Sequence, residues 1–131
     1  MKLKPLEVYK KAFGSYDIRS FHTEVLDEPF AYVLGRALAL YMKETYGESN
    51  MLIGGDTRVC NNGLISYFIA GMQSEGYDTI HLADFDPRDG YEPGKDLVFG
   101  VASSSVIYYI TRNTFDVGVV FSASHNPKEY A

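Results

Sequence analysis

The hydrophobic positions after Asp27 repeat with the period of a helix. Apolar side chains recur three or four residues apart and form one stripe: Phe30, Val33, Leu34, Ala37, Leu38 and Tyr41. Asp27 is a favourable N-cap, and Pro29 is tolerated in the first turn because an N–H at that position has no helical partner. Gly47 suits the left-handed residue that often ends a helix. The pattern therefore predicts a core helix between Asp27 and Gly47, in which Gly35 costs about 1 kcal/mol relative to alanine.

Short apolar runs alternate with two further helical patterns. Residues 51–53 and 79–83 are typical of strands. Between them, Asn61 or Asn62 is expected to cap a helix that ends at Gly76 and has one apolar face: Leu64, Ile65, Phe68, Ile69 and Met72. Such a β-α-β unit has parallel strands and a right-handed crossover. A serine-capped helix near residues 103–110 precedes the run 115–121, which is apolar enough for a strand buried on both faces. Together these elements predict an α/β fold.

A polar loop, Ser122-Ala123-Ser124-His125-Asn126-Pro127, follows the last predicted strand. Pro127 favours an extended conformation at Asn126, so Ser124 is expected just beyond the carboxyl end of the strand. Ligands of open α/β sheets bind at that edge. From spacing alone, an ordinary strand-to-helix turn rich in serine and asparagine explains the loop equally well.

The composition of the chain limits the classes of protein to which it can belong. The 131 residues suffice for the core of one domain, and 46% hydrophobic with 22% charged residues is typical of a globular chain. A net charge of -5 argues against non-specific nucleic-acid binding. Cys60 is the single cysteine, so an internal disulfide is excluded. The start of the chain lacks the apolar run of a signal peptide and no run is long enough to span a bilayer, so we expect a cytoplasmic protein without membrane partners.

Three motifs, met in the same order, resemble those of the α-D-phosphohexomutases, the phosphomannomutase/phosphoglucomutase family. Residues 13–19 are similar to the family signature F-x-x-Y-D-I-R, residues 54–58 to its G-R/K-D-T-R turn, and residues 122–127 to its phosphoserine loop, T/S-A/G-S-H-N-P. The chain also departs from the family. Gly55 stands where the family often has a basic residue, and residues 100–105 lack both prolines of the usual P-T-P helix start. Residues 86–96 look like a local insertion.

The resemblance implies chemical roles for five residues. Ser124 would carry the phosphoryl group, and His125 would position it or assist proton transfer. Tyr16, Arg19 and Asn126 would bind the substrate or its phosphate, for which the planar fork of an arginine is well suited. Without the resemblance, an exposed Tyr16 and a solvated Arg19 are the simpler interpretation.

The resemblance also implies the first domain of a longer enzyme, spanning residues 1–131 and ending just after the phosphoserine loop. Its fold would be a three-layer α/β/α domain with a small mixed, mostly parallel sheet, incomplete at its C-terminus. Family members move phosphate between C1 and C6 of a hexose phosphate through a hexose bisphosphate. Mg²⁺ bridges the phosphoserine and the carboxylates of a second domain.

We therefore expect Ser124 to contribute to a metal site only through its phosphate, and the fragment to be inactive by itself. An uncovered sheet edge would favour a homodimer of the fragment. The residues 16–19, Tyr-Asp-Ile-Arg, favour the phosphomannomutase/phosphoglucomutase branch over the phosphoglucosamine branch. They do not indicate which hexose phosphate is the substrate.

Two interpretations compete with a mutase domain. One is a stand-alone interaction module that keeps the fold without catalysis. The other is a small Mg²⁺-dependent phosphatase, because Asp84 and Asp86 resemble the D-x-D motif of haloacid-dehalogenase phosphatases. Arg88 stands where that motif has threonine or valine. A solvated, turn-forming acidic loop is the simpler interpretation of these residues.

Overall fold

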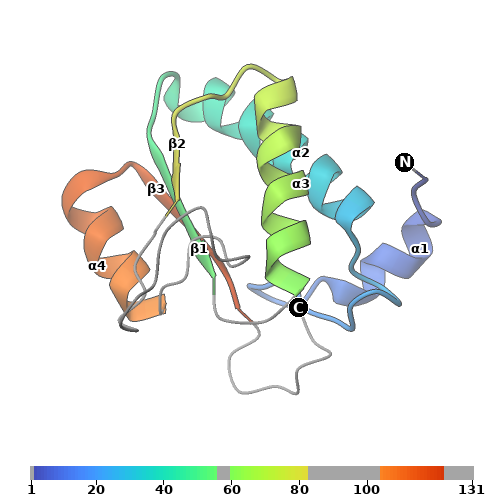
Figure 1. Ribbon diagram of the computed structural model, residues 1–131. Coiled ribbons are helices and arrows are strands. Elements are labelled where there is room, and N and C mark those ends of the chain that lie inside the picture. The colour runs from blue at the N-terminus through green and yellow to red at the C-terminus, as the bar shows by residue number, and fades with distance from the viewer. Residues whose placement is uncertain (1, 56–59, 83–103, 123–131) are drawn as a thin grey trace.

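The computed structural model describes residues 2–55, 60–82 and 104–122, which form three layers (Figure 1). The described strands are β1 (Met51–Gly55), β2 (Ile80–Leu82) and β3 (Val117–Phe121), paired in parallel in the order β2-β1-β3. Helices α2 (Glu28–Tyr46) and α3 (Cys60–Ser74) cover one face of the sheet, and α4 (Ser104–Thr114) covers the other. The short helix α1 (Leu6–Tyr9) and a 3₁₀ turn (Lys10–Ala12) lie beside the start of α2. The predicted α/β/α fold is confirmed.

Strand β1 is the centre of the core and is buried along its whole length. Met51 and Ile53 pack in the cluster formed with α2 and α3, whereas Leu52 packs with Ile107 of α4 on the opposite face. This alternation follows from the two-residue period of a strand. A parallel strand between two helical layers needs apolar residues on both faces. This requirement explains why residues 51–53 of β1 form a continuous hydrophobic run.

The ends of α2 are those that the sequence predicts. The N-cap carboxylate of Asp27 accepts a hydrogen bond of 3.0 Å from the backbone N–H of Phe30. Pro29 lies in the first turn, and Gly47 ends the helix with a φ of 66°. These local signals determine where the helix begins and ends, and they involve only residues at or near its two ends.

The buried face of α2 differs from the predicted stripe. Val33, Ala37 and Tyr41 are exposed, whereas the helix buries a neighbouring row of mostly small residues: Ala31, Gly35, Ala39 and Met42. The larger apolar residues Leu34 and Leu38 flank this row and are half-buried. Small side chains occupy the centre of this buried face because they let α3 approach closely. A pattern of hydrophobic positions does not encode this preference for small residues.

Two glycines show how close the approach of α2 and α3 is. A Cβ atom on Gly35 would lie 2.1 Å from the carbonyl oxygen of Phe68 on α3. A Cβ atom on Gly71 of α3 would lie 2.0 Å from the carbonyl oxygen of Tyr32 on α2. The propensity cost of Gly35 is therefore only one part of its effect, because each glycine also makes room for the backbone of the other helix.

Helix α3 has the predicted apolar face and a different beginning. Leu64, Ile65, Phe68 and Met72 are buried, Ile69 packs against them, and Gly76 follows with a φ of 78°. The helix starts at Cys60, so neither Asn61 nor Asn62 is its N-cap as predicted. Asn61 is 3% exposed and uses its side-chain amide for a contact with β3 that is described below.

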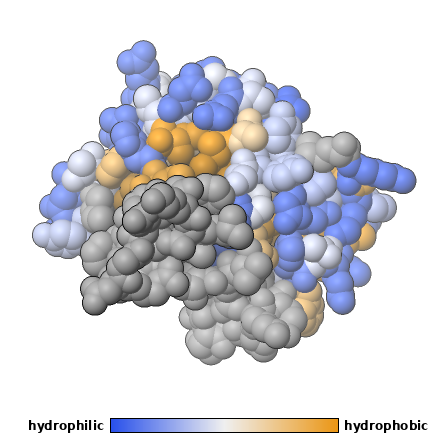
Figure 2. All heavy atoms as spheres, viewed as in Figure 1, coloured by the Kyte–Doolittle hydropathy of each residue, from blue (hydrophilic) through white to orange (hydrophobic). Residues whose placement is uncertain are grey.

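The prediction that the run 115–121 is a strand buried on both faces is wrong for β3. Four of its five residues are only partly buried, and Gly118 is exposed. Among the described strands β3 pairs with β1 alone, so it lies at the edge of this sheet. Figure 2 shows that apolar atoms on the viewed face gather over the region of the sheet beside α3. The homodimer expected from an uncovered edge stays a prediction.

A hydrogen-bonded cluster joins the N-terminal segment to the start of α2. The hydroxyl of Tyr9 donates to the carboxylate of Asp27, with distances of 3.1 and 3.2 Å to its two oxygens. The backbone N–H of Lys4 donates to the Tyr9 hydroxyl at 2.9 Å, and Lys4 Nζ lies 3.0 Å from Asp27 Oδ2. The ring of Tyr9 also stacks on Phe30 at 4.9 Å between ring centroids. No local pattern predicts this cluster, because Tyr9 and Asp27 are 18 residues apart along the chain.

This cluster makes stability at high pH depend on Tyr9. Burial raises the pKa of Tyr9 above its ordinary value of 10.0, and the hydrogen bond to Asp27 adds to the rise. The folded chain therefore holds the Tyr9 proton at pH values where the unfolded chain has lost it. The resulting stabilisation is complete below about pH 10 and is lost as the pH rises through the folded pKa.

We expect Tyr9→Phe to lower the free energy of unfolding by about 1 kcal/mol at neutral pH, because a buried hydrogen bond is lost. The gap between the variant and the unmodified chain should narrow as the pH rises above about 10. Urea denaturation at a series of pH values measures both effects. Tyr109→Phe is the control, since Tyr109 is 73% exposed and its removal should leave the pH profile unchanged. A gap that stays constant with pH would contradict the assignment.

Candidate functional site

A hollow of about 450 Å³ lies where the carboxyl end of β3 meets the first turns of α3 and the loop before α2. Figure 1 shows these three segments gathered at one end of the molecule. The three parallel strands direct their carboxyl ends toward the same edge, where α/β proteins commonly bind ligands. This hollow is the candidate site.

Residues 13–19 form a tight turn that borders the hollow. The N–H of Gly14 donates to the carbonyl of Asp17 at 2.9 Å, and Phe13 and Ile18 form an isolated antiparallel bridge. The N–H of Arg19 donates to the carbonyl of Ala12 at 2.8 Å, which joins the turn to the 3₁₀ segment. The closure of this turn brings both predicted residues, Tyr16 and Arg19, to the rim of the hollow.

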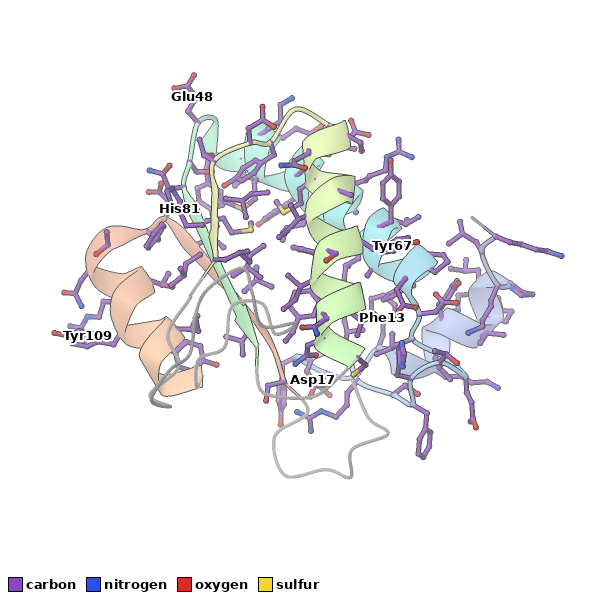
Figure 3. The ribbon with its side chains drawn as sticks, in the orientation of Figure 1. Phe13, Asp17, Glu48, Tyr67, His81 and Tyr109 are labelled. Atoms are coloured by element: carbon purple, nitrogen blue, oxygen red, sulfur yellow. The ribbon has the colours of Figure 1, made fainter. Side chains whose placement is uncertain are left out.

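Tyr16 and Arg19 differ in how far the protein covers them. Tyr16 is 95% exposed and stands at the tip of the turn. The guanidinium Nη2 of Arg19 lies 3.3 Å from Oδ2 of Asp17, and about a third of the arginine side chain, 34%, is exposed. Figure 3 shows Asp17 near the lower end of α3, in the region where β3 ends. Arg19 therefore presents a fixed positive charge at the edge of the hollow, oriented by one carboxylate.

The walls of the hollow are mainly apolar and come from three elements: Phe30, Ala31 and Leu34 of α2, Leu64 and Phe68 of α3, and Val119, Val120 and Phe121 of β3. The rings of Phe68 and Phe121 meet edge to face, with centroids 5.3 Å apart. A polar or charged ligand at the rim would thus lie over a surface that excludes water, which strengthens its electrostatic contacts.

The end of β3 is held by α3 through a side chain that sequence reasoning assigned another role. The amide of Asn61 donates to the carbonyl of Phe121 at 3.0 Å, and both residues border the hollow with Ser122. The signal that could have identified Asn61 is an asparagine in the first turn of a helix that follows a glycine-ended strand. Judged from the neighbouring residues alone, that pattern predicts that Asn61 caps the helix.

Three of the five predicted site residues, Ser124, His125 and Asn126, lie outside the described residues. Residues 56–58 of the second motif and the acidic pair Asp84 and Asp86 also lie outside them. Of the predicted phosphoserine loop, residues 122–127, the structure describes Ser122, which borders the hollow. The loop begins here, and Ser124 follows two residues later in the sequence.

The part of the chain that the structure describes contains no group of three histidine, cysteine, aspartate or glutamate side chains placed to hold a metal ion. These residues therefore do not by themselves make up a Mg²⁺ site. Within the same residues, no helix is long and apolar enough to cross a membrane.

The chain matches the profile described as "Phosphoglucomutase/phosphomannomutase, alpha/beta/alpha domain I" over residues 10–88 and 94–131. The chain belongs to this family. Both matched ranges together contain the three motifs at residues 13–19, 54–58 and 122–127. The unmatched residues 89–93 fall within the segment 86–96 that the sequence predicts to be an insertion.

Curated relatives of this phosphoglucomutase/phosphomannomutase domain carry two names. A "Phosphomannomutase" of Methanocaldococcus jannaschii is 32% identical over 118 residues, which are 90% of this chain and 21% of the relative. A "Phosphoglucosamine mutase" of Thermotoga petrophila is 35% identical over 120 residues, and one of Clostridium botulinum is 35% identical over 121 residues; each alignment covers 92% of this chain and 23% of the relative. The chain thus spans about a fifth of the length of these relatives. Since both names occur at similar identity, these matches do not favour the branch predicted from residues 16–19.

No solved structure matches the chain significantly.

Proposed function

We propose that this domain carries the phosphoserine of a phosphohexomutase, an enzyme that moves phosphate between C1 and C6 of a hexose phosphate. The observation that supports this most directly is the position of the third motif. In a chain of this family, the phosphoserine-like loop begins at the end of β3, beside a hollow whose rim carries Arg19. The proposed partners are a hexose phosphate and a hexose bisphosphate, and the proposed location is the cytoplasm.

The chemistry assigned to Ser124 is a reversible phosphoryl transfer. A free hydroxyl of the hexose phosphate attacks the phosphorus, the bond between phosphorus and Oγ of Ser124 breaks, and a bond to the sugar oxygen forms. The sugar hydroxyl loses its proton to a base, and the serine oxygen regains a proton. After the bisphosphate reorients, its other phosphoryl group returns to Ser124 by the same step in reverse.

His125 and Asn126 are proposed to support this step from the same loop. Adjacent side chains in extended backbone point to opposite sides, so we do not expect a direct hydrogen bond between His125 and Ser124. The proposal therefore gives His125 a role in orienting the loop or in moving a proton through the substrate. Asn126 would contribute an amide donor to a phosphate oxygen.

Arg19 is proposed to hold the phosphate that is not being transferred. Its guanidinium can donate two parallel hydrogen bonds to phosphate oxygens, and the apolar walls beside it exclude the water that would otherwise hydrolyse the phosphoserine. Tyr16 at the tip of the turn would close over the sugar. The Mg²⁺ that the resemblance implies stays part of the proposal, and its carboxylate ligands would have to come from outside the described residues. Since this domain forms one wall of such a site, we expect no turnover from the 131-residue chain alone.

Arg19→Ala tests this assignment in the mutase that carries the domain. We expect a fall of about 10- to 100-fold in kcat/KM, because hydrogen bonds to a charged phosphate are worth about 1.5–3 kcal/mol. Arg19→Lys should recover part of the loss, since it restores the charge without the planar fork. Steady-state kinetics and urea denaturation of each variant separate the effect on turnover from the effect on stability.

The matched control for Arg19→Ala is Arg36→Ala. Arg36 also pairs with a carboxylate, its Nη2 lying 2.8 Å from Oε1 of Glu75, but it lies on α2 and is not among the residues that border the hollow. Its loss should leave kcat/KM within about twofold of the unmodified enzyme, as expected for an exposed ion pair. Equal kinetics for the two alanine variants would remove Arg19 from the site.

A further inference from the structure

The side chain of Asn61 is a buried polar group for which the proposed chemistry has no role. It is 3% exposed and lies in the first turn of α3, where it does not serve as the cap. An amide buried to this extent is costly unless it is hydrogen-bonded. Its Nδ2 atom donates to the backbone carbonyl of Phe121 at 3.0 Å, a contact between residues 60 positions apart.

The bonded carbonyl belongs to the last residue of β3. Phe121 is opposite Gly55 in the parallel register, and no later residue of β3 continues the ladder. Its ring is held against Phe68, whose centroid is 5.3 Å away. Phe121 is therefore attached to α3 twice, once through its ring and once through its carbonyl, at the point where the chain leaves the sheet.

Gly55 leaves room beside this hydrogen bond. A Cβ atom on Gly55 would lie 3.0 Å from the carbonyl oxygen of Phe121 and 3.1 Å from Nδ2 of Asn61. A side chain at position 55 would thus press on both ends of the bond. The family motif that the sequence resembles often has a basic residue at this position. The glycine of this chain and the amide of Asn61 are consequently two parts of one arrangement.

We propose that Asn61 is a positioning residue for the phosphoserine loop, acting through the carbonyl of Phe121. This inference rests on the proposed function. Ser124 is three residues beyond Phe121, within about 10 Å of extended chain, so the direction in which the chain leaves β3 determines where its hydroxyl can reach. The bond from Asn61 fixes that direction, and Gly55 leaves the space for it.

Asn61→Asp is the most specific test, because it keeps the size of the side chain and replaces the amide donor by a carboxyl group, which when ionised only accepts and repels the carbonyl oxygen of Phe121. In the mutase that carries the domain, we expect kcat to fall by about 10- to 100-fold with KM changed less than about twofold, as for a misplaced reacting group. Asn61→Ala should act in the same direction. Ile65→Val is the control, since it removes one buried methylene group one turn further along α3 and keeps the amide.

Gly55→Ala provides a second test that leaves the donor in place. By itself it should lower kcat, because its Cβ presses on the bond. Combined with Asn61→Ala, which removes the amide that the new Cβ meets, it should add less than it does alone. Such non-additivity is expected only if the two positions act through the same contact. Simple multiplication of the two effects would overturn the link between Gly55 and Asn61.

Hydrogen–deuterium exchange on the 131-residue chain tests the positioning without any turnover. In Asn61→Asp, peptides that cover residues 119–127 should exchange at least about tenfold faster, while peptides from β1 and α2 should exchange as in Ile65→Val. If Asn61→Asp and Ile65→Val give equal exchange in residues 119–127, the proposal is overturned. Faster exchange in a protein that shows no phosphoryl transfer would instead support the positioning contact between Asn61 and Phe121 and reject the mutase function.

Discussion

Gly71→Ala is expected to be one of the two most destabilising additions of a single methyl group to the described glycines of α2 and α3. The new Cβ would lie 2.0 Å from the backbone carbonyl oxygen of Tyr32, far inside van der Waals contact. A backbone atom cannot rotate away as a side chain can, so α2 and α3 must separate. Separation would disturb a core that includes Phe68 and Met72.

The expected loss is about 3 kcal/mol in the free energy of unfolding, at the upper end of the range for overpacked cores. The gain in helix propensity from glycine to alanine, about 1 kcal/mol, is too small to compensate. For a chain of this length the total stability is roughly 7–20 kcal/mol, so the loss is a considerable fraction of it. Gly35→Ala, whose Cβ would lie 2.1 Å from the carbonyl oxygen of Phe68, should behave in the same way.

Urea denaturation followed by circular dichroism measures this effect, with Gly63→Ala as the matched control. Gly63 lies in the same helix, but the atom nearest to its added Cβ is Oε1 of the Glu28 side chain, which can move aside. The control should be neutral or slightly stabilised through its helix propensity. If Gly71→Ala lay within about 0.5 kcal/mol of Gly63→Ala, the close approach of the two helices would be contradicted.

Ser124→Ala is expected to have the largest effect on activity. If Ser124 is the residue that carries the phosphoryl group, its loss removes the covalent intermediate. We then expect kcat to fall by at least about a thousandfold in the mutase that carries the domain. Stability should change by less than about 0.5 kcal/mol if the serine acts in catalysis and not in the fold.

The control for Ser124→Ala is Ser122→Ala, two residues earlier in the same loop. Ser122 borders the hollow at the end of β3, so its substitution tests whether any hydroxyl in the loop suffices. It should retain most of the turnover. Comparable losses in both variants would indicate that the loop needs its conformation more than a particular nucleophile, and would contradict the role of Ser124.

Local signals in the sequence predicted both ends of α2 well. Asp27, Pro29 and Gly47 mark α2 because caps and terminating glycines act within a few residues of chain. The apolar face of α3 was predicted for a similar reason, since its residues are large and repeat with the helical period. The buried face of α2 was not predicted, because it depends on the close approach of α3, which leaves no room for a side chain at Gly35.

The sequence predicted the motifs of the candidate site, but not how the residues of these motifs are arranged in space. The turn at residues 13–19 was identified by resemblance, and the structure adds the hydrogen bonds that bring Arg19 to the rim of the hollow. Asn61 was given the wrong role because an asparagine at a helix start is usually a cap. Its true partner, Phe121, is 60 residues away, and no local pattern encodes that contact.

The central claim is that Ser124 is the phosphorylated residue, and site-resolved mass spectrometry of the protein after treatment with a hexose bisphosphate tests it most directly. Trypsin cleaves after Arg112 and Lys128, which releases a peptide that contains three hydroxyl residues: Thr114, Ser122 and Ser124. Fragmentation of this peptide distinguishes them. The account predicts phosphate on Ser124 alone, lost again when excess hexose monophosphate is added. Phosphate on Ser122 in its place, or mutase turnover without phosphate on this peptide, would contradict it.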